Sequence, residues 1–212
     1  PYSTGYLQKF KLHKVENGFV ILHPTENQPD EIPTYKHSPK LFYTFEEYKN
    51  WLNIMEIETV GELNLLISQG SDKVRELIRI SEALHEKKYA EIADEIVKRK
   101  KIRLITIAGP SSSGKTTSAK RIALHLKVHG LRPISISLDD FFLERDKTPR
   151  DEFGNYDFES INALDLDLFN KTMNDLIDGK EVMMPKFDFT SGRRTWYPKP
   201  LKIEKDQPII IE

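Results

Sequence analysis

Residues 102–116 read IRLITIAGPSSSGKT and contain the feature that decides the fold. The run 102–108 is short, apolar and dominated by isoleucine and leucine, which is typical of a buried strand. Residues 109–116 match the pattern G-x-x-x-x-G-K-[ST] at every required position. Apolar residues at helical spacing follow, with Gly130 as the stop of that helix and Pro133 just beyond it. The order of strand, Gly/Ser-rich loop and helix predicts a phosphate-binding loop in an α/β domain.

The chemistry of such a loop requires these residue types. Glycine lets the backbone fold so that successive N–H groups point at phosphate oxygens, and the next helix directs its positive end there. Lys115 supplies a charge at the β- and γ-phosphates, and Thr116 offers a hydroxyl to Mg²⁺. The sequence therefore predicts a nucleoside triphosphate site. Its residues are Gly109, Pro110, Ser111, Ser112, Ser113, Gly114, Lys115, Thr116 and Thr117.

The rest of the second half alternates between strand and helix signals. Apolar runs at 133–138 and 207–212 predict strands, and apolar residues at helical spacing predict a helix between about 166 and 177. Residues 182–204 favour short strands and turns. This order predicts a parallel sheet with helices on both faces, in an α/β domain that occupies residues 101–212.

Residues 1–100 have a different pattern and predict a smaller α+β domain. The sequence Glu-Asn-Gly at 16–18 lies between apolar stretches, which is a strong signal for a β-hairpin. From Thr44 the apolar residues fall at helical spacing, with Thr44 as the expected N-cap. A short helix follows, and then a longer helical stretch capped by Ser71. The basic residues 98–101 end that stretch, and we place the domain boundary there.

Composition excludes several classes of protein. The chain has 212 residues and no cysteine, which excludes disulfides, thiolate metal sites, iron–sulfur clusters and thiol catalysis. The formal net charge of −1 argues against a broad nucleic-acid or membrane-binding surface but leaves a local patch open. No apolar run approaches the roughly 18 residues of a membrane span and no signal peptide is evident, so we expect a cytoplasmic protein. Because the chain starts without Met and stops directly after an apolar strand, we expect it to be incomplete at both ends.

Two carboxylates, Asp139 and Asp140, follow the predicted strand at 133–138. Ligands of open α/β sheets bind beyond the carboxyl ends of the strands. A kinase needs a carboxylate there to orient or deprotonate the acceptor hydroxyl. A helix cap or a turn is the alternative interpretation, and position alone does not decide between the two.

Several segments of the second half resemble uridine kinases of the phosphoribulokinase/uridine kinase group, and they occur in the same order. These segments are Gly109–Thr117, Leu138–Phe142, Tyr156–Glu159, Met184–Phe189 and Ile209–Glu212. The longer pattern with Arg145, Thr148–Arg150 and Asp165 is most similar to bacterial uridine kinase-like proteins. Those proteins carry an N-terminal region similar to accessory domains of threonyl-tRNA synthetase. Gly5–Leu7, Pro39–Phe42 and Glu82–Glu86 resemble that region.

The resemblance implies an ATP-dependent kinase that uses Mg²⁺ and phosphorylates a hydroxyl of a nucleoside-like acceptor. It implies that Asp139 is the base on the ribose 5′-hydroxyl and that Asp157 binds the ribose hydroxyls. Glu212 matches an acid at the end of the Walker B strand, which helps to hold Mg²⁺ together with Thr116. Lys115 and Asp139 are then the implied catalytic residues.

Three positions depart from the uridine kinase pattern. Phe187 and Gly192 stand where the family has a tyrosine and a histidine that are used on the pyrimidine, and Phe142 replaces another tyrosine. Phe187 can stack on a base but has no hydroxyl, and Gly192 offers no side chain, so discrimination of the base is reduced. Arg194 is a further candidate for contact with substrate, with a place in a surface turn as the alternative. We therefore expect a kinase of this group rather than a strict uridine kinase.

Two alternatives stay open. One is an ATP-responsive RNA-binding or regulatory module, for which the basic run 98–101 is the sequence support. The other is a kinase of a non-nucleoside alcohol, since the wider family includes enzymes for pantothenate-like and sugar-phosphate acceptors. The expected partners are ATP and a small hydroxyl acceptor. No membrane partner is expected, nucleic acid is the less favoured partner, and a homo-oligomer stays open.

Overall fold

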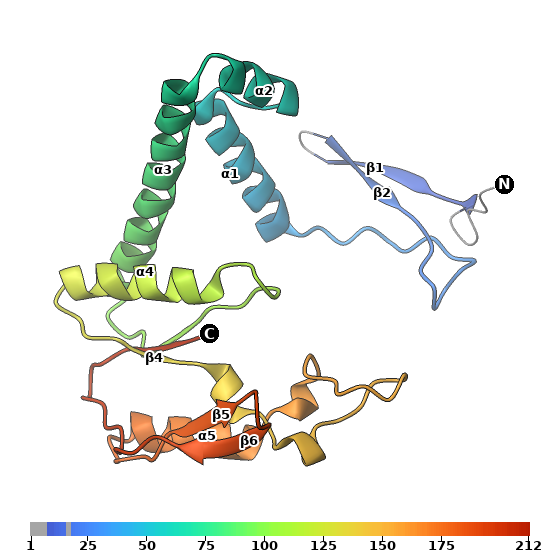
Figure 1. The fold of residues 1–212 in the computed structure, drawn as a ribbon. Coiled ribbons are helices and arrows are strands. Elements are labelled where there is room, and N and C mark those ends of the chain that lie inside the picture. The colour runs from blue at the N-terminus through green and yellow to red at the C-terminus, as the bar shows by residue number, and fades with distance from the viewer. Residues whose placement is uncertain (1–7, 16–17) are drawn as a thin grey trace. The chain divides into compact units, whose positions relative to one another are not determined.

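The computed structural model of the protein describes residues 8–15 and 18–212. By compactness the chain divides into two units, Pro1–Leu77 and Ile78–Glu212 (Figure 1). The sequence predicts a domain boundary at residues 98–101, where the kinase-like segment begins, and that boundary stays a prediction. Among the described residues, no helix is both long and apolar enough to cross a membrane.

A β-hairpin begins the first unit. Strands β1 (Lys11–Val15) and β2 (Gly18–Leu22) pair antiparallel, with Val15 opposite Gly18. The two strands therefore have the arrangement that the sequence predicts. The predicted turn residues Glu16 and Asn17 lie outside the described residues, as does the synthetase-like segment 5–7.

The first long helix starts earlier than its periodicity suggests. Helix α1 (Pro39–Met55) has Ser38 at its N-cap position and proline in its first turn. Proline is favoured there because the first helical N–H has no partner within the helix, so its absence costs nothing. The prediction of Thr44 as the N-cap is wrong: Thr44 lies inside α1, and its hydroxyl donates to the carbonyl of Lys40 at 2.9 Å.

Two more helices follow. Helix α2 (Val60–Ser68) begins with a capping box, in which Thr59 and Glu62 each accept a hydrogen bond from the other's backbone N–H. Helix α3 (Ser71–Lys98) is a single continuous helix, although the sequence also allowed for two. Its second part belongs to the second unit, where Ala93 is completely buried.

The second unit is built on a three-stranded parallel sheet. Its strands are β3 (Leu104–Thr106), β7 (Ile209–Ile211) and β4 (Ile134–Ile136), in that order across the sheet. The prediction of an α/β fold with a parallel sheet is thus confirmed. The last strand of the chain lies in the centre, so Ile209–Ile211 is covered on both faces and fully apolar.

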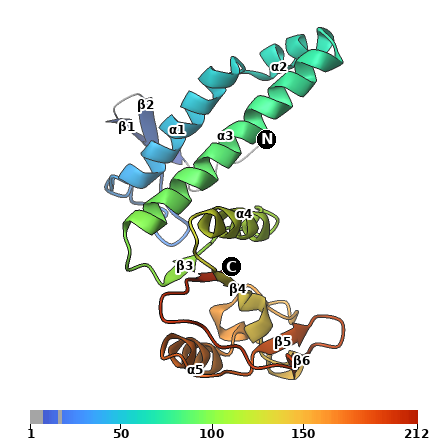
Figure 2. The ribbon, with the colours of Figure 1, turned by 90° about the vertical axis from the view of Figure 1, so that its left-hand side faces the viewer.

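Side chains of β7 alternate between two apolar layers, as expected for a strand. Ile210 packs with buried residues of α3 and of α4 (Lys115–Val128). Ile209 and Ile211 pack with buried residues of α5 (Leu166–Ile177). Figure 2 shows α4 on one side of the strands and α5 on the other, so helices cover both faces of the sheet.

A small antiparallel hairpin lies on the same side of the sheet as α5 (Figure 2). It consists of β5 (Pro185–Asp188) and β6 (Arg193–Trp196), with Asp188 opposite Arg193. Residues 189–192 form the turn between the two strands. A short 3-10 turn, η2 (Leu138–Phe141), follows β4 and packs against β5. The hairpin therefore lies beside η2, the segment that directly follows β4.

Candidate active site

The three parallel strands end at one edge of the sheet, and a cleft of about 690 Å³ lies there. β3 leads into the Gly/Ser loop, β4 leads into η2, and β7 ends at Glu212. The backbone ties these ends together, because the N–H of Leu138 donates to the carbonyl of Glu212 at 2.8 Å. The cleft is lined by Gly109, Pro110, Ser111, Ser112, Ser113, Gly114, Lys115, Thr116, Thr117, Ser137, Asp139, Phe142, Phe158, Glu159, Phe189 and Glu212.

The loop needs its two glycines for different reasons. Gly114 precedes α4 with φ of 86°, a conformation that residues with a side chain rarely adopt. Gly109 is restricted by space, because a Cβ atom there would lie 2.7 Å from Oγ of Ser113. The Lys115 ammonium donates to the carbonyl oxygens of Gly109 and Pro110 at 3.0 and 3.1 Å. The positive charge of Lys115 therefore lies within hydrogen-bond distance of the loop backbone.

The adjacent aspartates have different surroundings. Asp139 lines the cleft together with the loop residues. The carboxylate of Asp140 accepts the backbone N–H of Phe187 at 3.2 Å. Asp140 therefore joins η2 to β5, whereas Asp139 belongs to the lining of the cleft.

The electrostatic surroundings of Asp139 favour its neutral form. Partial burial in the wall of the cleft is the largest cause that raises its pKa above the ordinary range. The Lys115 ammonium opposes this rise, whereas the negative charges of Asp140, Glu212 and Glu159 add to it. A carboxylate with a raised pKa is a better proton acceptor once ionised, as required of a general base.

Oxygen donors suited to a hard cation also line the cleft. The Thr116 hydroxyl and the Glu212 carboxylate come from the loop and from the end of β7. Among the described residues, no group of three or more His, Asp or Glu side chains forms a closed metal cage. Mg²⁺ typically takes one or two carboxylates and completes its shell with water and substrate phosphates. The donors present therefore fit a magnesium ion shared with a nucleotide.

Three phenylalanines form an aromatic wall of the cleft: Phe142, Phe158 and Phe189. The ring of Phe142 contacts those of Phe158 and Phe189 edge-to-face, with centroids 5.4 and 5.9 Å apart. Phe187 was the predicted stacking residue, but its side chain is only 5% exposed and lies outside the cleft. It packs behind the wall, 5.0 Å from the Phe189 ring. Phe189 itself is 53% exposed and presents the accessible ring.

Two other candidates for substrate contact do not line the cleft. Asp157 accepts the backbone N–H groups of Glu159 and Ser160, both at 3.1 Å, and so shapes the turn that carries Glu159 into the cleft. Arg194 forms an ion pair with Asp165 at 2.8 Å and donates to the carbonyl of Phe142 at 2.8 Å. These contacts hold the backbone beside the cleft.

Glu159, Phe158 and Phe189 line the cleft, although no pattern in the sequence singles them out. Each lies within a segment that carries the family resemblance, so the signal was present at the level of the segment. What was missing was the direction of each side chain. That direction depends on turns and packing rather than on spacing.

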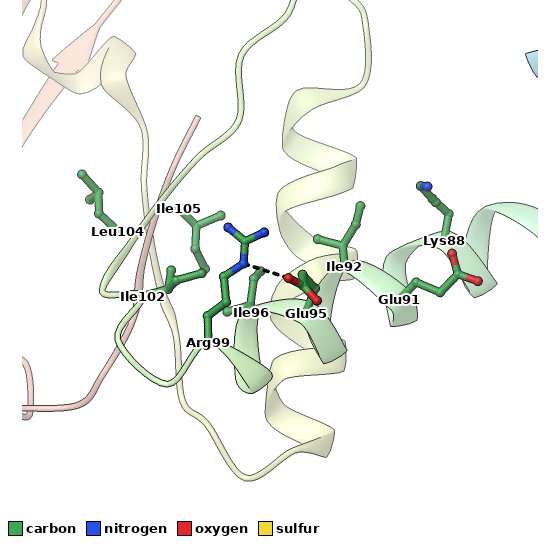
Figure 3. A pocket seen from close by; sticks show the side chains of 9 residues that line it. All are labelled: Lys88, Glu91, Ile92, Glu95, Ile96, Arg99, Ile102, Leu104 and Ile105. Carbon is green, nitrogen blue, oxygen red and sulfur yellow. Dashed lines mark hydrogen bonds and ion pairs between the residues drawn. The ribbon is translucent and has the colours of Figure 1, made fainter. Parts of the chain in front are cut away.

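A second cavity, of about 450 Å³, shares no residue with the cleft (Figure 3). It lies between the end of α3 and β3, and its walls include Ile92, Ile96 and Ile105. Its charged residues include Glu95 and Arg99, which pair with each other at 2.8 Å. With an apolar wall and its polar groups paired, this cavity offers less for phosphate chemistry than the cleft.

Comparison with known proteins gives consistent matches for the second half. Residues 104–212 match the Phosphoribulokinase / Uridine kinase family. The chain is 37% identical to uridine-cytidine kinase A of Dictyostelium discoideum over 93 residues, which are 43% of this chain and 17% of that protein. It is 30% identical to a uridine kinase of Lactobacillus helveticus over 109 residues, 51% of this chain and 50% of that one. The chain thus spans about half the length, or less, of these relatives.

A solved structure shares the fold. It is described as a possible uridine kinase from Bacillus stearothermophilus, and it aligns with 59% of this chain and 70% of its own chain. The TM-score is 0.50 and the sequence identity is 21%. This similarity supports the α/β architecture of the second unit.

Proposed function

Because the chain belongs to the phosphoribulokinase/uridine kinase family, we propose that it is an ATP-dependent kinase of a small-molecule alcohol. The observation that carries the proposal is one cleft lined by the whole phosphate-binding loop, Asp139 and Glu212. Nucleotide-binding, proton-accepting and cation-binding groups thereby meet at the carboxyl edge of a parallel sheet, where ligands of such sheets bind.

We assign the nucleotide to residues 109–117. Their backbone N–H groups and the positive end of α4 surround the β- and γ-phosphates. The Lys115 ammonium exchanges its two carbonyl partners for phosphate oxygens when ATP binds. Both carbonyl partners belong to the phosphate-binding loop, so the exchange requires only a movement of the Lys115 side chain.

The transfer step uses Asp139. The acceptor hydroxyl oxygen attacks the γ-phosphorus, the new O–P bond forms, and the bond from that phosphorus to the β–γ bridging oxygen breaks. Asp139 takes the hydroxyl proton, and ADP leaves with the bridging oxygen. The raised pKa of Asp139 suits this role, because it makes the ionised carboxylate a stronger proton acceptor.

Thr116 and Glu212 are the proposed residues that hold Mg²⁺, on the fit described above. When bound, the ion neutralises negative charge on the phosphates. The protein's own contribution is to place a hydroxyl and a carboxylate on elements fixed by the sheet. Glu212 directly follows β7, whose three residues are all buried.

For the acceptor we propose a nucleoside-like alcohol whose ring packs on the aromatic wall. The wall offers apolar ring surface from Phe142, Phe158 and Phe189, of which Phe189 is the most exposed. Glu159 is the charged side chain beside it. Such a surface recognises a ring by stacking and discriminates weakly between polar edges. A non-nucleoside alcohol stays the alternative acceptor.

Three further assignments rest on the sequence and remain proposals. Asp157 and Arg194 are placed on the acceptor side, where their contacts shape the backbone around the cleft. Residues 1–100 are proposed to form an accessory domain similar to those of threonyl-tRNA synthetase. A cytoplasmic location stays a prediction, and a homo-oligomer stays open.

The decisive experiment measures ADP release with MgATP against a panel of nucleosides and related alcohols. Wild-type protein should release ADP only when an acceptor is present. The Asp139→Asn variant should still bind MgATP but should no longer release ADP in response to the acceptor. Absence of MgATP binding, or an Asp139→Asn variant with full turnover, contradicts the proposal. Salt-sensitive binding of RNA that shifts with ATP, without turnover on the panel, would instead favour the regulatory module suggested by residues 98–101.

A further inference from the structure

The turn between β5 and β6 brings one ring into the cleft. Phe189 is the first residue of this turn, and it is the most exposed ring of the aromatic wall. Asp188 shapes the turn from within: its carboxylate accepts the N–H of Thr190 at 2.9 Å and the hydroxyl of Ser191 at 2.7 Å. These bonds set the shape of the turn, but they do not connect it to the rest of the unit.

Arg145 makes that connection. It begins the 3-10 turn η3 (Arg145–Lys147), far from the hairpin in the sequence. Its guanidinium donates from Nη2 to the carbonyl of Phe189 at 2.6 Å. Its backbone N–H donates to the carbonyl of Gly192 at 3.0 Å. Both ends of the turn are therefore bonded to one residue, and one of the two bonds is charge-assisted.

Gly192 makes this contact sterically possible. It is buried and has φ of 68°. A Cβ atom there would lie 2.6 Å from Nε, 2.8 Å from Cζ and 2.8 Å from Cβ of Arg145. The clash includes the near end of the arginine side chain, so a rotation of the guanidinium alone would not relieve it. A residue with any side chain at position 192 would displace Arg145 or the turn.

We propose that Arg145, packed on Gly192, is a positioning residue that fixes the β5–β6 turn and thereby holds Phe189 in the acceptor wall of the cleft. We call the two hydrogen bonds from Arg145 to the turn, together with its packing on Gly192, the lock. The expected effect of the lock on catalysis rests on the proposed kinase function, whereas the contacts themselves do not. The glycine at 192 then has a positive role. The absence of a side chain at Gly192 leaves room for Arg145, and Arg145 fixes the turn that carries the Phe189 ring.

The lock predicts a selective kinetic defect. The hydrogen bond of the Arg145 side chain is with the turn, and the phosphate-binding loop has its own bonds within residues 109–118. Loss of Arg145 should therefore raise KM for the acceptor and leave KM for MgATP and kcat nearly unchanged. A residue that serves only general stability would lower all activities together, through loss of folded protein.

The experiment compares wild type with Arg145→Gln, Arg145→Lys and Gly192→Ala. Arg145→Gln should raise the acceptor KM by about tenfold or more, the scale of a lost charge-assisted hydrogen bond, with MgATP KM within about twofold. Arg145→Lys keeps the charge and one donor, so it should recover part of the loss. Gly192→Ala should reproduce the Arg145→Gln defect, because the new Cβ occupies the space of the arginine.

Matched controls separate the lock from general effects. Gly179→Ala introduces a side chain at a similar φ of 77°, but nothing lies within 4 Å of its Cβ position. It should lower stability without changing the acceptor KM. Arg132→Gln removes an exposed arginine that does not line the cleft, and it should behave as wild type.

Amide hydrogen exchange tests the lock independently of any substrate. In Arg145→Gln, amides of residues 186–193 should exchange at least about tenfold faster, while those of 109–118 keep their protection. Unchanged exchange in the turn overturns the proposal, as does an unchanged acceptor KM in an active enzyme. If wild-type protein shows no acceptor-dependent ADP release, the proposed function fails, and the exchange result still decides the lock.

Discussion

Asp139 and Asp140 are consecutive in the chain and act on different parts of the second unit. Asp139 lines the cleft formed at the carboxyl ends of the strands. Asp140 accepts the N–H of Phe187 at 3.2 Å and thereby binds η2 to β5. A 3-10 turn starting directly after β4 produces this division, because neighbouring side chains on such a turn point in different directions.

The pair predicts two distinct mutant phenotypes. Asp139→Asn should reduce acceptor-dependent turnover by about 10²–10⁴-fold, the usual contribution of a general base, with little change in melting temperature. Asp140→Ala should lower the free energy of unfolding by about 1–3 kcal/mol, because the N–H of Phe187 loses its partner. Steady-state kinetics and thermal unfolding measure both. The reverse result, with catalysis dependent on Asp140 and stability on Asp139, would overturn the assignment.

The charges around Asp139 predict the pH dependence of the reaction. Burial and the nearby carboxylates raise the pKa of Asp139, so activity should be lost on acidification at a higher pH than for an unperturbed aspartate. Glu159→Gln removes one of the negative charges that favour the protonated form. The pKa of Asp139 should fall, and the acid limb of the kcat/KM profile should move to lower pH.

Glu152→Gln is the control for this pH shift. Glu152 is exposed and is not among the groups that raise the pKa of Asp139. Its removal should leave the acid limb where it is. An acid limb that stays fixed or moves upward in Glu159→Gln would show that Asp139 is not the titrating base.

The space around Gly109 predicts a specific nucleotide-binding defect. Gly109→Ala should weaken MgATP binding by about tenfold or more, because its Cβ would lie 2.7 Å from Oγ of Ser113 and force the loop apart. Ser113→Ala removes that atom, so the double variant should bind MgATP better than Gly109→Ala alone. Calorimetric titration measures each affinity. Gly61→Ala in α2 is the control and should bind as wild type, and a double variant no better than Gly109→Ala would refute the steric explanation.

The ion pair between Arg194 and Asp165 predicts a pH-dependent stability. Burial works to raise the pKa of Asp165, but the N–H of Leu168 and the Arg194 guanidinium outweigh it and hold the pKa below its usual range. The stabilisation is therefore present at neutral pH and is lost as the pH falls through that lowered pKa. Arg194→Gln should cost about 1.5–3 kcal/mol at neutral pH and less in acid.

Urea unfolding at several pH values measures this effect. Arg193→Gln, which changes the exposed neighbour of Arg194, should stay within about 0.5 kcal/mol of wild type. A loss in Arg194→Gln that is the same at neutral and acidic pH would show that Asp165 is not its partner in solution.

Local signals predicted much of the architecture. The apolar run before the loop became β3, the periodic residues after it became α4, and Gly130 and Gly179 follow α4 and α5 closely. The start of α1 differs from the prediction, because the helix begins at Pro39 after Ser38 without a side-chain capping bond, and the apolar periodicity does not report that position. Capping depends on a few backbone hydrogen bonds, so helix ends are harder to predict than helix centres.

The class of site follows from local sequence alone, because the glycines, lysine and threonine of the phosphate-binding loop lie within one short segment. Local sequence also indicates the candidate carboxylates Asp139 and Glu212, since both follow strands whose carboxyl ends meet in a parallel sheet. The arrangement of the acceptor side, in contrast, depends on packing in three dimensions. Phe187 is buried behind Phe189, and Arg145 packs on Gly192 from a segment more than forty residues away. Such contacts are set by packing between elements distant in sequence, which no local pattern encodes.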